Sequence, residues 1–299
     1  MVKIGLALGG GGARGLAHIG VIKHLHNAGI KLHCIAGTSA GAIVGAIYAS
    51  SQNPALIEDK LLLMLRSKEF RSIKLDYVRG KKAEKDSVFE SVRRHFFTGM
   101  FYASSFTRLS FVNDQTYRSL INMLIDDLMI EKLPIKFSAV AVDILNGKVL
   151  KIETGALREA IMASSAIPGV LPAVQKDNML LVDGSFIDTV PVRHTRQLGA
   201  DIVIAVDVSS PLDSVKVPKR GIDLIWRSNA ILRHIAKEEQ LQGADIIIRP
   251  SLDGLEWTDF GRYMDMIRQG AQAAQLQIQE LSGLIKANEQ RGLYAANSK

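Results

Sequence analysis

The sequence predicts an α/β protein of three layers, α/β/α, built around a mostly parallel central sheet. Short apolar runs alternate with segments whose apolar residues recur at helical spacing along most of the 299 residues. Several of the runs are uniformly apolar, as strands are when helices cover both faces of a parallel sheet. No internal repeat and no convincing linker breaks the alternation, so we expect one domain over residues 1–299.

The first elements follow from apolar spacing and from helix boundaries. A strand over residues 2–8 ends in glycines, and the helix after it is closed by Asn27 and Gly29. A second strand leads into a helix of small residues that stops before Pro54, where a third, amphipathic helix begins. Up to residue 129, the expected strands lie at 2–8 and 31–36, and the expected helices lie at 13–28, 40–50, 54–66, 87–97 and 115–129.

The remaining elements begin with a hairpin, because Asn146-Gly147 separates two strand-like runs at 136–144 and 148–153. A helix that stops before Pro168 follows, and further alternation leads to a long terminal helix. After residue 153, the expected strands lie at 179–182, 201–208 and 245–248, and the expected helices lie at 155–164, 191–198, 221–242 and 258–289.

Composition excludes several classes of protein. Hydrophobic residues make up 47% of the chain, which is too high a share for a disordered protein. The single cysteine, Cys34, excludes both a disulfide framework and a cysteine-based zinc site. The formal net charge of +7 suits an anionic partner, but no recognition motif for nucleic acid accompanies it, so we expect no nucleic-acid partner.

Much of the excess positive charge lies in residues 66–110. This stretch holds eleven basic and five acidic residues together with six of the ten phenylalanines. One interpretation is an insertion whose phenylalanines pack on the core. The other is a lid or a membrane-contact element, since bulky apolar side chains beside arginine and lysine suit an anionic lipid surface. The sequence leaves both open, and it leaves the oligomeric state open.

The pattern of the chain predicts neither a signal peptide nor a membrane span. The first strand leads directly into glycines, without the apolar core and cleavage site of a signal peptide. The uncharged stretch 32–57 contains glycines, Asn53 and Pro54, so its apolar part is too short to cross a bilayer. We therefore expect a cytoplasmic protein, with peripheral membrane contact left open.

A glycine-rich loop follows the first expected strand. Gly10, Gly12 and Gly15 fit the G-x-G-x-x-G pattern of dinucleotide sites, but such a site needs an acidic residue about 20 positions further on. The first acid of the chain is Glu58, and the lysine of a phosphate-binding loop is also missing. What remains is a set of backbone N–H groups at a helix N-terminus, which suits an anion. A tight strand-to-helix turn is the alternative interpretation.

The second expected strand ends in a nucleophile motif. Gly37-Thr38-Ser39-Ala40-Gly41 matches G-x-S-x-G between a strand-like run and a helix, the context in which this motif places a serine on a sharp turn. The small residues let the strand and helix backbones pass closely. We expect the Ser39 hydroxyl to project beside a helix N-terminus, where developing negative charge is stabilised.

A serine nucleophile needs a base, and the seven histidines are poorly placed for that role. His194 is the best placed of them. Asp183 directly follows the apolar run 179–182, so we expect it at a strand end, on the ligand-binding edge of an open α/β sheet. A carboxylate within hydrogen-bond reach can take the serine proton without an imidazole. Asp183-Gly184 is also a common turn sequence.

These elements together resemble the three signatures of patatin-like phospholipases. The signatures are Gly10-Gly11-Gly12-Ala13-Arg14-Gly15, Gly37-Thr38-Ser39-Ala40-Gly41 and Asp183-Gly184. Residues 163–168 resemble the block that the family carries between its nucleophile and its aspartate. The resemblance covers about residues 2–210, and the chain is similar to the compact bacterial members related to the catalytic region of neuropathy target esterase. One departure is Ser185, where the family often has glycine or alanine.

The resemblance implies a patatin-like serine hydrolase with a Ser–Asp dyad, in which Ser39 is the nucleophile and Asp183 the general base. It implies hydrolysis of acyl esters in phospholipids or lysophospholipids through an acyl-Ser39 intermediate, with no metal and no cofactor. The residues implied for the oxyanion hole are Gly10, Gly11 and Gly12, with Arg14 in support, and those implied to support the motifs are Gly37, Gly41 and Gly184.

Two other functions remain open from the sequence. An acyltransferase would use the same dyad and pass the acyl group to a carrier or a lipid instead of water. Transferases with similar motifs use a histidine base, and none is well placed here. An inactive lipid-binding regulatory protein would need neither Ser39 nor Asp183, and both are present.

Overall fold

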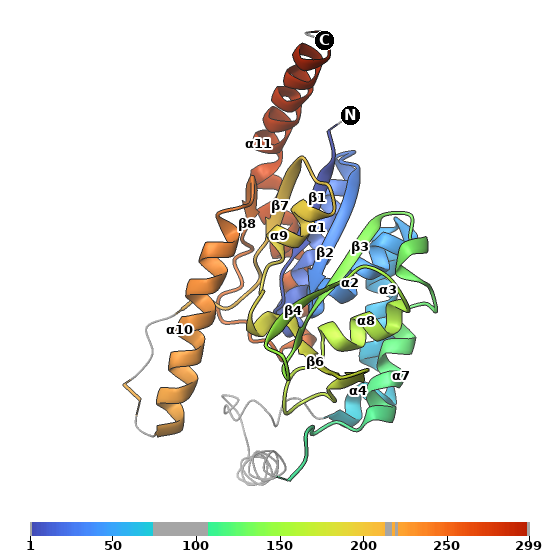
Figure 1. The fold of residues 1–299 in the computed structure, drawn as a ribbon, viewed down its shortest axis with the longest axis vertical. Coiled ribbons are helices and arrows are strands. Elements are labelled where there is room, and N and C mark those ends of the chain that lie inside the picture. Colours follow the sequence, from blue (N-terminus) through green and yellow to red (C-terminus); the bar gives the residue numbers. More distant parts are fainter. Residues whose placement is uncertain (1, 74–106, 213–216, 219–220, 298–299) are drawn as a thin grey trace.

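The computed structural model describes residues 2–73, 107–212, 217–218 and 221–297, and in this part a central sheet lies between helices (Figure 1). The sheet has eight strands in the order β5-β6-β3-β2-β1-β7-β8, with β4 also paired to β3. The strands are β1 (Ile4–Leu8), β2 (Leu32–Thr38), β3 (Lys136–Asp143), β4 (Lys148–Ile152), β5 (Val174–Lys176), β6 (Met179–Asp183), β7 (Ile202–Val206) and β8 (Ile246–Ile248).

The α-helices of the described part cover the sheet on both faces. They are α1 (Ala17–Asn27), α2 (Ala40–Ser51), α3 (Pro54–Arg66), α4 (Lys68–Ile73), α7 (Asp114–Leu124), α8 (Leu157–Ser164), α9 (Val192–Gln197), α10 (Gly221–Leu241) and α11 (Tyr263–Asn297). Leu6 and Leu8 of β1 belong to the large core that includes α1 and α2, whereas Ala7 between them faces the smaller core beside α9. The expected three-layer class is confirmed.

The sheet is more mixed than expected. The five strands β3-β2-β1-β7-β8 are parallel, as predicted. The hairpin of β3 and β4 is also confirmed, but β6 is antiparallel to β3, and β5 is antiparallel to β6. The strand β5 was not expected, because three residues are too few to show a strand period.

Several helix boundaries differ from expectation, and the end of α11 at Asn297, instead of residue 289, is one of them. Residues 12–16 form a 3-10 turn before α1, and α11 begins at Tyr263 after another such turn over Phe260–Arg262. The helix α7 ends at Leu124 instead of residue 129, because Ile125 is buried in an extended conformation. The expected helix at 87–97 lies outside the described residues, as does most of the 66–110 stretch. Among the described helices, none is long and apolar enough to cross a bilayer.

The strand β3 fixes the relative position of two other strand ends. Its Val140 pairs with Thr38, the last residue of β2. The next residue, Ala141, pairs with Asp183, the last residue of β6. Since β4 occupies the opposite edge of β3, strands β2 and β6 share one edge and meet end to end. The residue that follows β2, Ser39, is therefore placed beside the end of β6.

The helix α11 packs against α1 so closely at Gly270 that no side chain would fit at this position. A Cβ at Gly270 would overlap the backbone carbonyl of Ala17. In contrast, nothing lies within contact distance of a Cβ added at Gly283, further along the same helix.

Gly270→Ala is expected to lower the free energy of unfolding by about 1–3 kcal/mol, because the added methyl group forces the two helices apart. Gly283→Ala is the matched control and is expected to raise it by up to about 1 kcal/mol, since alanine has the higher helix propensity. Urea denaturation of the three proteins measures both effects. Equal effects of the two substitutions would contradict the close α1–α11 contact.

Candidate active site

Ser39 occupies a strained turn between β2 and α2. Its φ of 55° and ψ of −122° lie in a region that residues with a side chain rarely adopt. Gly41 allows this turn to approach β1, because a Cβ there would overlap the backbone of Leu8. Gly37 is the last but one residue of β2 and pairs with Leu8 and Ala139 in the sheet.

A second serine holds the backbone of Ser39. The Ser39 N–H donates to the Ser164 Oγ at 3.0 Å, and the Ser164 hydroxyl donates to the Val140 carbonyl at 2.7 Å. Ser164 is fully buried at the end of α8. Residues 163–168 resemble a family block, but the sequence alone assigns no role to Ser164, since the contact joins residues 125 positions apart.

Asp183 lies at the end of β6 with 2% of its surface exposed. Its Oδ1 accepts a hydrogen bond from the Ser185 N–H at 2.8 Å, just after Gly184 begins a 3-10 turn. Burial raises the pKa of the Asp183 carboxyl above its usual value, and hydrogen bonds from Ser39 and Ser185 and the charge of Arg233 offset part of that rise. Ser39 and this buried carboxyl group line the same cavity.

The glycine loop offers fewer free N–H groups than the sequence suggested. The Gly10 N–H already donates to the Thr189 carbonyl at 3.0 Å, and the Ala13 N–H donates to the Trp257 carbonyl at 2.8 Å. Gly11 and Gly12 stand at the N-terminus of the 3-10 turn, where N–H groups lack partners within the helix. Both residues line the same cavity as Ser39.

Two cavities of different character meet at Ser39. One, of about 450 Å³, contains Asp183 and the side chains of Arg227 and Arg233. The other, of about 150 Å³, is lined almost wholly by apolar side chains from α2, α3 and α7, such as Ile43 and Leu61. The residues that line both are Gly12, Ser39, Ile167 and Trp257. The site therefore has a polar side and an apolar side with the serine between them.

A family model described as patatin-like phospholipase matches residues 6–196. The chain belongs to this family.

Three relatives show how far the likeness extends. The chain is 29% identical over 289 residues to the patatin-like phospholipase domain-containing protein 6 of Mus musculus, covering 87% of this chain and 19% of that protein. It is 28% identical over 292 residues to the lysophospholipase nte1 of Aspergillus fumigatus (89% and 18%). It is 33% identical over 207 residues to an uncharacterised NTE family protein of Mycobacterium tuberculosis (69% and 49%). The chain thus spans between about a fifth and a half of the length of these relatives.

Among solved structures, VipD from Legionella pneumophila matches with a TM-score of 0.47 and 14% identity, covering 92% of this chain and 66% of that one. The type III effector protein ExoU matches with a TM-score of 0.38 and 13% identity, covering 93% and 53%.

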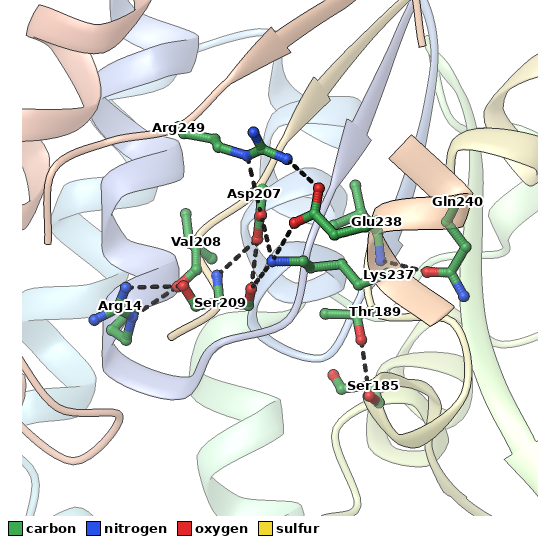
Figure 2. Close-up of polar contacts among 11 residues, drawn as sticks. Arg14, Ser185, Thr189, Asp207, Val208, Ser209, Lys237, Glu238, Gln240 and Arg249 are labelled. Carbon is green, nitrogen blue, oxygen red and sulfur yellow. Dashed lines mark hydrogen bonds and ion pairs between the residues drawn. The ribbon is translucent and has the colours of Figure 1, made fainter. Parts of the chain in front are cut away.

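The patatin-like range contains Ser39 and Asp183 but ends before α10. The helix α10 nevertheless forms one wall of the polar cavity, and a buried ion pair holds it to the sheet (Figure 2). Lys237 of α10 contacts Asp207, which follows β7, at 2.9 Å, and both side chains are almost completely buried. Burial raises the pKa of Asp207, but hydrogen bonds from Ser209 and the charge of Lys237 outweigh it and leave this pKa below its usual value.

Arg14 ties the glycine loop to the segments that follow β7 and β8. Its buried guanidinium donates to four backbone carbonyls at 2.7–2.9 Å, two of which Figure 2 shows. The acceptors are Val208, Ser209, Leu252 and Leu255. Because the carbonyls are fixed, the guanidinium fixes the loop that carries Gly11 and Gly12.

His18 also supports the glycine loop, a role that was not expected from the sequence. Its Nε2 lies 2.7 Å from the Gly9 carbonyl, which can only accept, so Nε2 carries the proton. Burial lowers the pKa of His18 to about 4, partly offset by the Gly9 hydrogen bond and by the charge of Asp207. One signal could have found it, because His18 lies one helical turn after Arg14.

His194, the alternative base, lines neither cavity. It lies on α9, with Nε2 3.1 Å from an Asp188 carboxylate oxygen and Nδ1 3.3 Å from Gln197. In the described residues, no three His, Cys, Asp or Glu side chains gather as metal ligands would.

The buried, neutral His18 predicts a specific loss of stability in acid. Its folded pKa lies below the unfolded value of about 6.5, so its contribution is complete above pH 6.5 and is lost as the pH falls through 4. Between pH 7 and 5, the wild type is expected to lose about 2 kcal/mol more unfolding free energy than His18→Gln, which keeps a donor to Gly9 but cannot be protonated. Urea titrations at the two pH values measure the difference.

The control is His24→Gln, on the same helix but not buried. It should lose stability with falling pH in parallel with the wild type. If the unfolding free energy of His18→Gln also fell with pH as steeply as that of the wild type, His18 would not be the neutral buried group described.

Proposed function

We propose that this chain is a serine-dependent acyl-ester hydrolase that acts on phospholipids or lysophospholipids. The observation that carries the proposal is the position of Ser39, which shares a polar cavity with the buried Asp183 at the point where that cavity meets an apolar one. Such a site suits an amphiphile whose ester lies at the serine. Family membership and a relative named as a lysophospholipase add support.

In the proposed reaction, the Ser39 hydroxyl attacks the ester carbonyl carbon while Asp183 accepts its proton. The raised pKa of Asp183 makes its carboxylate a stronger proton acceptor than an exposed aspartate. The N–H groups of Gly11 and Gly12 stabilise the oxyanion, each by about 10²–10³ in rate. Asp183 returns the proton to the leaving alcohol, and an acyl-Ser39 remains. Water activated by Asp183 then releases the fatty acid.

The two alternative functions have less support. An acyltransferase would use the same residues with an acceptor alcohol in place of water, and no observation on the described residues favours it. An inactive lipid-binding protein would have no use for a serine in a strained turn beside a buried carboxylate, and strain of this kind persists only where the surroundings enforce it.

Ser39→Ala and Asp183→Asn are each expected to reduce the hydrolysis of short acyl esters by at least about 10³-fold, because one removes the nucleophile and the other its base. His194→Ala is the control and should remain near wild-type turnover. Release of p-nitrophenol from its short-chain esters measures the rates, and a fluorophosphonate probe should label the wild type but not Ser39→Ala. Normal turnover in Asp183→Asn together with loss in His194→Ala would refute the dyad.

The second part of the proposal is peripheral contact with an anionic lipid surface. The 66–110 stretch, where the sequence suggested such contact, falls mostly outside the described residues. Within them, α10 carries an apolar face of four side chains that are each 58–65% exposed. They are Leu224, Ile225, Leu232 and Ile235, and their spacing gathers them on one side of the helix. An exposed apolar face of this kind suits a lipid surface.

Leu232→Glu is expected to weaken binding to phosphatidylglycerol vesicles by about tenfold or more, because a carboxylate neither enters the lipid nor tolerates anionic headgroups. Leu276→Glu is the matched control, since Leu276 is 82% exposed and lies on a different helix, α11. Vesicle co-sedimentation over a series of salt concentrations measures binding. Equal weakening by both substitutions, or binding that salt does not affect, would argue against this surface.

A further inference from the structure

The polar cavity has a cationic wall that the hydrolytic mechanism does not use. The helix α10 contributes Arg227, Ala230, Arg233, His234 and Lys237 to the lining. Lys237 is engaged by Asp207, as described above. The two arginines form no ion pair with a carboxylate in the part of the chain that the structure describes. Two arginine side chains that are not in ion-pair contact with a carboxylate thus line the cavity.

One contact and one electrostatic effect place Arg233 near the reacting groups. Its guanidinium lies 5.6 Å from the centroid of the Phe186 ring, and Phe186 belongs to the turn that directly follows Asp183. Its charge is also near enough to lower the pKa of Asp183. Arg233 is therefore a neighbour of the proposed dyad that contacts neither Ser39 nor the glycine loop in any described hydrogen bond.

A buried polar group without a partner lies in the same wall. The His234 Nδ1 is buried and has no hydrogen-bond partner among the described residues. His234 lines the polar cavity from α10, as the two arginines do. Buried polar atoms normally have a partner, so this atom, on the helix that carries the two guanidinium groups, indicates a ligand that brings acceptor oxygens.

We propose that this wall, centred on Arg233 and Arg227, binds the phosphate group of the substrate, so that the enzyme selects acyl esters of glycerophosphates over neutral esters. The inference rests on the proposed function, because it places the scissile ester at Ser39. The acyl chain then occupies the apolar cavity, and the glycerol backbone carries the phosphate to the opposite side. Arginine suits this role because its planar fork donates two hydrogen bonds to a phosphate. Arg233 thus determines specificity and is not a catalytic residue.

The test compares two esters with the same acyl chain, monooctanoyl glycerophosphocholine and monooctanoylglycerol, both below their micelle concentrations so that surface binding does not contribute. The measured quantity is the ratio of their kcat/KM values. Arg233→Ala is expected to lower this ratio by about tenfold to a hundredfold, the effect of losing a charged hydrogen bond. Any change in the pKa of Asp183 affects both substrates and cancels in the ratio.

Two further variants sharpen the result. Arg233→Lys keeps the charge but loses the fork, so its ratio should fall between those of the wild type and Arg233→Ala. Arg268→Ala removes the same charge from the exposed face of α11, where Arg268 pairs with Asp265, and it should keep the wild-type ratio. A ratio that is unchanged in Arg233→Ala, or that falls equally in Arg268→Ala, would overturn the proposal.

Failure of the phosphate site and failure of the proposed hydrolase activity give different results. If the wild type hydrolyses the neutral ester and Ser39→Ala does not, the proposed hydrolase activity is supported, whatever the ratio of the two kcat/KM values is. Inorganic phosphate distinguishes a headgroup from a free anion. A headgroup site predicts weak competition by inorganic phosphate against monooctanoylglycerol. Strong competition that Arg233→Ala abolishes, without a change in the ratio of the two esters, would assign the wall to a free anion and contradict the headgroup site.

Discussion

The pairing of β3 with two successive strands along one edge is the constraint on which the site depends. Because β2 gives way to β6 between Val140 and Ala141, the ends of two strands about 145 residues apart in sequence meet at a single residue step. The hydrogen bonds of the sheet therefore set the relative position of the two strand ends. A shift of β6 by one residue would turn Asp183 to the opposite face of the sheet.

The surroundings of Ser39 explain how a strained turn persists in the folded protein. A residue with a side chain at positive φ costs about 1–3 kcal/mol, so other contacts must enforce it. Here the Ser164 hydroxyl holds its N–H, and Arg14 and His18 hold the neighbouring loop through backbone carbonyls. These supports are polar, directional and buried, so they resist the small displacements that would relax the turn.

The sequence was sufficient to predict the parts of the site that depend on local chemistry. The G-x-S-x-G turn at Ser39 and the strand end at Asp183 follow from patterns within about ten residues. Ser164 and His18 could not be assigned this way, because their partners lie in other elements and only the fold selects one serine or one histidine among several. The sequence could not show which N–H groups of the glycine loop are free, since the hydrogen bond from the Gly10 N–H to the Thr189 carbonyl is visible only in the structure. The three-residue strand β5 was too short to show any period.

The meeting of a polar and an apolar cavity at Ser39 has a kinetic consequence. In the proposed cycle, the two halves of a cleaved substrate lie in different compartments, and water reaches the acyl-serine from the polar one. The departing alcohol occupies that same path, so the second step cannot start until the alcohol has left. The residence time of the alcohol therefore sets how often the acyl-enzyme reverts to substrate. An alcohol that binds the polar side tightly would slow turnover even if both chemical steps were fast.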